Sequence, residues 1–247
     1  MSQFQSYTKR QLDMALQLIR RAIYVEVAPL EIEAWCTHEP VPFAERRTGE
    51  HRVLKIGDKW GDLFDSAWFH FTGRVPKAAT GQHVVLLLDI SGELCVVDKE
   101  GMPLRGLTPV ASTYDYSLGE PGKRVFQVAQ EAIGGEVVDV WADAGCNDLF
   151  GNVVNEGRIR QAAIAICHDE VRALYYDFEV LLDLMKVLPE DSPRHQQILT
   201  GLTDVVHLLY EGIVEMAIEA RAVLRPLLAQ RGGDPSLRVS AIGHAHI

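Results

Sequence analysis

The chain has 247 residues, 47% of them hydrophobic, and a formal net charge of −10. That length and apolar content are sufficient for one large or two small folded domains. The acidic balance, without any run of Lys or Arg that could follow a phosphate backbone, argues against nucleic acid and anionic membranes as partners. The first ten residues, MSQFQSYTKR, lack the apolar stretch of a signal peptide, and no apolar run approaches the length that crosses a bilayer.

The four cysteines, Cys36, Cys95, Cys146 and Cys167, are widely spaced and form no C-x-x-C pair. Their spacing predicts neither a disulfide framework nor a zinc ribbon. Reduced thiols are typical of intracellular proteins, so the sequence predicts a cytoplasmic location.

The first expected element is an amphipathic helix over residues 8–24. Leu12, Leu16, Ile19 and Ile23 follow one another at spacings of four, three and four, which places them on one helical face. After this helix the chain changes to short runs rich in Val, Ile, Trp and Phe between Gly, Pro and Asp clusters. This pattern predicts a β-sandwich of roughly eight to ten strands.

The clearest strand is Ser66–Pro76, SAWFHFTGRVP. Alternation along it places Trp68 and His70 on one face and Phe69 and Phe71 on the other. This strand is therefore expected to present one face to the core.

Five more strand regions follow. The run His83–Ile90 is apolar throughout, which is typical of a central strand. Residues 93–107 read as a hairpin in which Gly101 supplies the positive φ of the turn. Further strands are expected over residues 124–132, 136–145 and 158–167.

A helical region begins near Asp169 and ends at Pro189. Its apolar side chains recur at helical spacing: Leu174, Phe178, Leu181, Leu182, Met185 and Leu188. A second helix is expected from Pro193, with Ser192 as its cap, to about Gln230, with or without a break. The segment Gly232–Pro235 ends it, and LRVSAIGHAHI then reads as the first strand of another domain.

The predicted fold is therefore mainly β with α: an antiparallel β-sandwich, galactose-binding or jelly-roll-like, preceded by one helix and followed by a helical hairpin. The expected division is an N-terminal helix over 1–25, the sandwich over 26–168, the helical hairpin over 169–232 and the first strand of a further domain over 233–247.

Two histidines stand at alternate positions of that last strand. Because alternate side chains of a strand point to one face, His244 and His246 would lie side by side, as two ligands of one metal do. The alternative is a chain end with no ordered partner.

Three aromatic residues are candidates for stacking on a sugar. Trp60 lies in the polar stretch GDKWGD, and Tyr114 and Tyr116 flank an aspartate that could accept a hydroxyl hydrogen bond. The alternative for Trp60 is packing against a neighbouring domain. Trp68 and Trp141 lie within strand patterns and are expected to pack in the core or between the sheets.

Several short stretches, in the same order, resemble the N-terminal region of the class II α-mannosidases, glycoside hydrolase family 38, in the cytosolic and vacuolar branch with its bacterial relatives. They are WGDLFDSAWFHFTGRVP, VVLLLDISGELCVVDKEGMPLRGLTP, CNDLFG, LYYDFEVLLDL and AIGHAHI. Catalytic domains of this family begin with a strand that ends in Gly-His-x-His-x-Asp. AIGHAHI matches that motif up to the residue before the Asp.

The resemblance implies an enzyme that hydrolyses α-mannosides with retention, using two carboxylates and a divalent metal, usually zinc. His246 matches the metal-binding His, and the other ligands and both carboxylates would lie beyond Ile247. The chain would then be a non-catalytic accessory region that ends at the start of the catalytic domain. Alone it is expected to hydrolyse nothing and to hold no cofactor.

The partners that the resemblance implies are the catalytic domain of the same longer chain and a mannose-containing oligosaccharide, with a second copy of the chain as a further candidate. Such an accessory region is expected to expose an apolar patch where the rest of the enzyme packs. The alternative is a stand-alone carbohydrate-binding or interaction module built on the sandwich.

Overall fold

The computed structural model describes residues 3–108, 124–146, 156–230 and 240–243. The chain divides into two compact units, one of residues 1–19 with 170–247 and one of residues 20–169. Each unit is described separately below.

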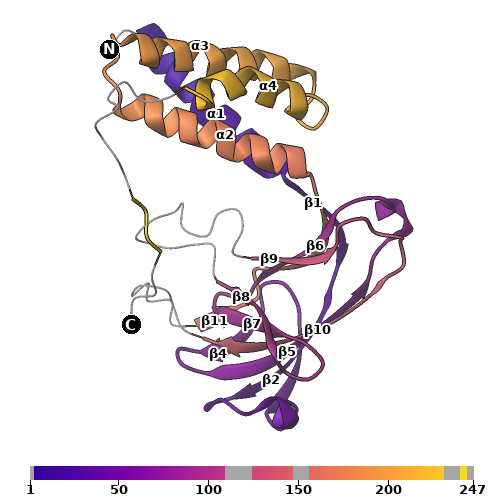
Figure 1. Ribbon diagram of the computed structural model, residues 1–247. Coiled ribbons are helices and arrows are strands. Elements are labelled where there is room, and N and C mark those ends of the chain that lie inside the picture. Colours follow the sequence, from indigo (N-terminus) through magenta and orange to yellow (C-terminus); the bar gives the residue numbers. More distant parts are fainter. Residues whose placement is uncertain (1–2, 109–123, 147–155, 231–239, 244–247) are drawn as a thin grey trace. The chain divides into compact units, whose positions relative to one another are not determined.

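The unit of residues 20–169 is a sandwich of antiparallel sheets (Figure 1). One sheet has the order β1 (Tyr24–Pro29), β12 (Gln161–Cys167), β6 (Val84–Asp89), β9 (Val125–Ala129). The other has the order β3 (Glu50–Leu54), β2 (Glu31–Thr37), β5 (Ser66–Arg74), β10 (Val137–Gly145), β7 (Glu93–Val97), β8 (Pro103–Leu107). β11 (Glu156–Arg158) pairs with β4 (Lys59–Asp62), and the short 3-10 helices η1 (Phe43–Glu45) and η2 (Lys77–Ala79) lie in connections. The predicted antiparallel sandwich is confirmed.

The core lies between the two large sheets. Phe69 and Phe71 of β5 pack there with Leu86 of β6 and Ile164 of β12. All six residues of β6 are buried, which confirms its central position. The sandwich therefore rests on apolar side chains that alternate inward from both sheets.

Trp68 is buried as expected and Trp141 is half-buried, but both lie outside the cluster between the two sheets, so the expected inter-sheet position is corrected. Alternation puts their side chains on the outer face of the six-stranded sheet, opposite the core residues next to them in β5 and β10. Trp68 is nevertheless buried and donates its indole N–H to the Val41 carbonyl at 2.9 Å. Trp141 stacks between His70 and Trp35, at ring distances of 4.3 and 5.3 Å. The segment around Val41 and Phe43 packs on Trp68, and Trp141 packs against the neighbouring rings on the outer face of the sheet.

Two connections decide how the strands end. The hairpin turn forms as expected: Gly101 has φ 85°, and the Asp98 carboxylate accepts the N–H groups of Glu100 and Met102. The strand predicted over 158–167 is wrong as one piece. It breaks at Ile159, whose N–H donates to the Asp58 carbonyl at 3.0 Å, so β11 and β12 pair with different partners.

The other unit is helical. It contains α2 (Asp169–Val187) from Glu170 onward, α3 (Pro193–Leu208), η4 (Leu209–Glu211) and α4 (Ala217–Leu228), together with the first part of α1 (Gln3–Ala22). Ser192 caps α3 as predicted, accepting the His195 N–H at 3.2 Å. The predicted second helix breaks at Gly212, whose φ of 135° no other residue readily adopts, so α4 is a separate helix.

The apolar stripes of the predicted helices are buried. Leu12 and Ile19 of α1 are at most 1% exposed, and the α2 stripe from Leu174 to Met185 is buried at each expected position. Of the strand expected over 233–247, residues 240–243 are exposed and extend no sheet, and the others lie outside the described residues. The domain division thus stays a prediction.

Candidate functional site

Of the sequence-predicted site residues, Trp60 alone lies in the described part of the chain. Tyr114, Tyr116, His244 and His246 all lie outside the described residues. Trp60 is described, and its side chain is 0% exposed. The prediction that Trp60 stacks on a sugar is therefore corrected, because no face of its ring is open to a ligand.

Trp60 is instead a core residue at one end of the sandwich. Its stretch forms β4, in which Trp60 and Gly61 are buried between exposed Lys59 and Asp62. The indole N–H donates to the Ile90 carbonyl at 2.7 Å, and the ring meets Phe69 edge to face. Trp60 is therefore a packing residue, and its partners belong to the sandwich itself and not to a neighbouring domain.

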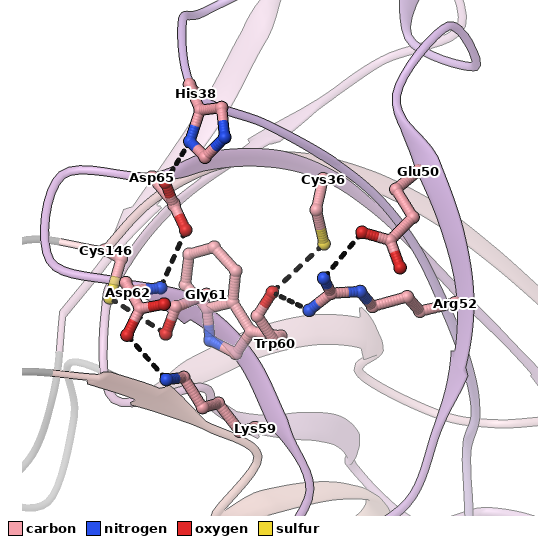
Figure 2. A network of polar contacts seen from close by, with 10 residues as sticks. All are labelled: Cys36, His38, Glu50, Arg52, Lys59, Trp60, Gly61, Asp62, Asp65 and Cys146. Carbon is pink, nitrogen blue, oxygen red and sulfur yellow. Dashed lines mark hydrogen bonds and ion pairs between the residues drawn. The ribbon is translucent and has the colours of Figure 1, made fainter.

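A tight loop follows β4, and Figure 2 shows its Asp65 carboxylate directed toward His38 and Asp62. The Asp65 carboxylate accepts the Asp62 N–H at 2.7 Å and lies 2.8 Å from His38 Nδ1. Burial opposes ionisation of Asp65, but these two hydrogen bonds, with smaller electrostatic contributions from His38 and Arg52, outweigh it and hold the pKa of that carboxyl below its ordinary value. A further hydrogen bond, from the Phe64 N–H to the Cys146 carbonyl, also holds the loop in place.

Polar groups also hold the backbone of β4 from its other side (Figure 2). The Trp60 carbonyl accepts from Arg52 Nη1 at 2.8 Å and from the Cys36 thiol at 3.1 Å. Arg52 in turn pairs with Glu50 at 2.7 Å. These contacts fix the Trp60 carbonyl, and in the loop that follows β4 the side chain of Phe64 is exposed.

The loop forms one wall of a cleft of about 580 Å³. Its lining comes from the loop and from the ends of β5, β7, β8 and β10: Pro40, Phe64, Asp65, Ser66, Glu93, Leu94, Cys95, Gly106, Leu107, Thr108, Asp143, Ala144, Gly145 and Cys146. Phe64 is 75% exposed and has φ 72°, a backbone conformation that bulky residues rarely adopt. The aromatic ring and the carboxyl groups of Asp65, Glu93 and Asp143 thus share one surface depression.

Burial disfavours the charged forms of two ionisable groups inside the cleft, the Asp143 carboxyl and the Cys146 thiol. Burial raises the pKa of the Asp143 carboxyl, partly offset by a hydrogen bond from the Ala144 backbone. Burial, with smaller contributions from Asp65 and Asp62, raises the pKa of the Cys146 thiol to about 11. A protonated thiol is a poor nucleophile, so the cleft is better suited to binding than to catalysis. Its carboxyl groups can accept hydrogen bonds from ligand hydroxyl groups, and the Phe64 ring offers one aromatic face.

Sequence reasoning missed Phe64 and Asp65. The available signal was the stretch DLFD between two strands, where a large aromatic residue stands in a turn with an aspartate on each side. An aromatic side chain that no strand alternation assigns to the core is a candidate for exposure.

Comparison with known proteins identifies the family. The family model described as "Alpha-mannosidase, jelly roll domain" matches residues 28–165. The chain is 25% identical over 241 residues to Alpha-mannosidase 2C1 of Mus musculus, covering 93% of this chain and 22% of that protein. It is 26% identical to Alpha-mannosidase 2C1 of Homo sapiens, covering 87% and 21%, and 23% identical to Alpha-mannosidase G of Dictyostelium discoideum, covering 80% and 18%.

The chain thus spans about a fifth of the length of these relatives. None of the described helices is both long and apolar enough to cross a membrane. The matched range runs from β1 to β12, which is the sandwich itself. From its sandwich and from this match over more than half its length, the chain belongs to the alpha-mannosidase jelly-roll domain family.

Proposed function

We propose that this chain is the non-catalytic N-terminal accessory region of a cytoplasmic, metal-dependent, retaining α-mannosidase that acts on α-mannosides of oligosaccharides. The observation that carries the proposal is the family match over residues 28–165. The order of the shorter resemblances, which ends on the Gly-His-x-His motif, agrees with it. The relatives are much longer, which leaves room for a catalytic domain outside this chain.

An apolar groove in the helical unit supports the accessory role. The groove, of about 470 Å³, is lined by α1 and by the end of α3 with the residues after it: Arg10, Gln11, Met14, Ala15, Leu18, Val206, Leu209, Tyr210 and Ile213. Met14, Leu18 and Tyr210 are 60%, 51% and 76% exposed. We assign its occupant to the rest of the same polypeptide, because exposed apolar side chains grouped in this way mark an interaction surface and because this chain covers 22% of the length of its mouse relative.

The catalytic chemistry would belong to that longer polypeptide. His246, with the aspartate that the family places two positions later, would hold a divalent metal, which would polarise sugar hydroxyls. Two carboxylates about 5 Å apart would carry the retaining displacement. Both carboxylates would lie beyond Ile247.

The 247-residue chain is expected to show no turnover of a nitrophenyl α-mannoside with added Zn²⁺, Co²⁺ or Mn²⁺. One metal-ligand His without its partners makes no open catalytic site. The assay compares the chain with the longer polypeptide at equal molar concentration, with a chelator in parallel. Metal-dependent hydrolysis by the 247-residue chain would contradict the proposal.

A second candidate function is sugar binding in the cleft beside β4, and the exposed Phe64 ring favours it. Aromatic rings stack on the apolar faces of pyranoses, and the carboxyl groups of Asp65 and Asp143 can bond to sugar hydroxyls. The charge of the cleft suits a neutral or basic sugar rather than an acidic one. In this case the sandwich would hold an oligosaccharide chain near the enzyme's active site.

Replacing Phe64 with Ala is expected to weaken binding of a mannose oligosaccharide about tenfold, which corresponds to the roughly 1.4 kcal/mol of a stacked ring. Calorimetry or a glycan array measures the change. Phe64→Tyr keeps the ring and should bind normally, and Ile56→Ala alters an exposed apolar residue outside the cleft. A wild-type chain that binds no glycan would remove this candidate and leave the accessory role intact.

A further inference from the structure

A second group of metal-ligand side chains lies in the sandwich unit, away from the cleft. His83 stands just before β6, Cys167 ends β12 and Asp169 is the first residue of α2. One ligand atom from each lies within 4.8 Å of the other two. His83 Nδ1 is 2.9 Å from Asp169 Oδ2, and Cys167 Sγ is 3.6 Å from Asp169 Oδ1.

The backbone holds these three residues in register. β6 and β12 are antiparallel neighbours, and the Cys167 N–H donates to the His83 carbonyl at 2.8 Å. Gln130 Nε2 donates to Asp169 Oδ2 at 3.1 Å, which orients the carboxylate from outside the group. Outer hydrogen bonds such as the one from Gln130 orient ligand side chains in metal sites.

The group is buried on one side and open on the other. The His83 side chain is 8% exposed and Cys167 is 4% exposed, whereas the Asp169 side chain is 39% exposed. An ion can therefore reach the three ligand atoms from the Asp169 side. A tetrahedral ion held by three side chains would keep its fourth position toward solvent.

We propose that His83, Cys167 and Asp169 bind one Zn²⁺ ion, with water as the fourth ligand. A set of one sulfur, one nitrogen and one oxygen ligand suits zinc, while Mg²⁺ and Ca²⁺ prefer oxygen ligands alone. On binding, the Cys167 thiol releases its proton to solvent and the thiolate sulfur bonds to the metal. Thiolate and carboxylate together then balance the two positive charges of the ion.

This site is separate from the metal that the proposed function assigns to His246. Its ligands all come from the sandwich unit and from the residue that ends it. A metal here would join β6, β12 and the start of α2, and so would act on the stability of the sandwich rather than on a sugar. The alternative is that the same three side chains form only an ion pair and a thiol hydrogen bond.

Cobalt titration of the 247-residue chain, stripped of metal under reducing conditions, tests the site. Co²⁺ is expected to give the intense visible bands of tetrahedral coordination and a thiolate charge-transfer band, saturating at one ion per chain. Zn²⁺ should abolish these bands by displacement and should raise Tm as its concentration rises.

Cys167→Ser is expected to abolish the charge-transfer band, and His83→Gln should weaken cobalt binding at least tenfold. Asp169→Asn, which keeps the shape of that side chain, should weaken it similarly. Two controls should bind as the wild type does: Cys95→Ser, a thiol elsewhere in the sandwich, and His246→Ala. Circular dichroism of each apo variant verifies that it is folded.

Three results would overturn the proposal: no tetrahedral cobalt spectrum in the wild type, a spectrum that Cys167→Ser leaves unchanged, or one that His246→Ala abolishes. None of these results bears on the α-mannosidase assay of the longer polypeptide. The two proposals can therefore fail independently.

Discussion

Trp60→Ala is expected to lower the free energy of unfolding of the sandwich by about 4 kcal/mol, within the range measured for a buried large aromatic residue replaced by Ala. The side chain is fully buried, meets Phe69 edge to face at 5.3 Å and donates its N–H to Ile90. Truncation leaves a cavity at the end of the core and an unpaired carbonyl. Urea denaturation followed by tryptophan fluorescence and circular dichroism measures the loss.

Trp60→Phe separates the two parts of this effect, because it keeps most of the ring and removes the N–H. Trp60→Phe is expected to lower the free energy of unfolding by less than Trp60→Ala does, because the Phe ring fills part of the cavity that Ala leaves empty. Phe64→Ala is the matched control, an exposed aromatic in the next loop whose loss should change stability by less than about 0.5 kcal/mol. Equal stability losses for Trp60→Ala and Phe64→Ala would contradict the burial of Trp60.

Gly157→Ala is expected to destabilise the same region by about 1–3 kcal/mol through overpacking. A Cβ at Gly157 would lie 2.4 Å from Trp60 Cε2 and Nε1. The ring cannot retreat, since its hydrogen bond to Ile90 and its contact with Phe69 hold it. The backbone pairing of β11 with β4 must shift instead.

The control for this variant is Gly106→Ala in β8, where an added Cβ meets nothing within 4 Å. It should be neutral within about 0.5 kcal/mol. The cost of Gly157→Ala should also largely disappear in a Trp60→Ala background, because residues in direct contact are not additive. An unchanged cost in that background would show that the indole ring is not what the new methyl group meets.

The fold was predictable wherever periodicity was unambiguous. The alternation in SAWFHFTGRVP placed Phe69 and Phe71 together on one face, which the structure shows to be the core face, and the helical stripe from Leu174 to Met185 predicted α2. The residues at which the elements begin and end were harder to predict. The break at Ile159 depends on a hydrogen bond to Asp58, which lies about a hundred residues earlier in the chain, and no local pattern reports it.

The candidate site was harder to predict because its residues take their roles from tertiary pairing. Trp60 stands among polar residues, which is typical of a loop, yet the pairing of β4 with β11 turns it inward. Phe64, only four residues later, is the exposed aromatic. Alternation says which residues share a face, and the pairing of distant strands decides which face is covered.

The proposed metal ligands could not be predicted from the sequence for the same reason. His83 and Cys167 are separated by most of the sandwich, so no ligand spacing in the sequence connects them. The pairing of β6 with β12 brings them together, and the start of α2 adds Asp169. Spacing rules find sites built on one turn or one helix, and they miss sites assembled across a sheet.

Determining the native reading frame past the codon for Ile247 tests whether this chain is the accessory region of an α-mannosidase. Asp is expected as the next residue and a Trp-Leu pair within a few positions, which would make His246 part of a metal-binding pair. A stop codon at that point would show that this chain is not the front portion of a longer α-mannosidase. The sandwich would then be a stand-alone module, and its function would have to be sought in the cleft around Phe64.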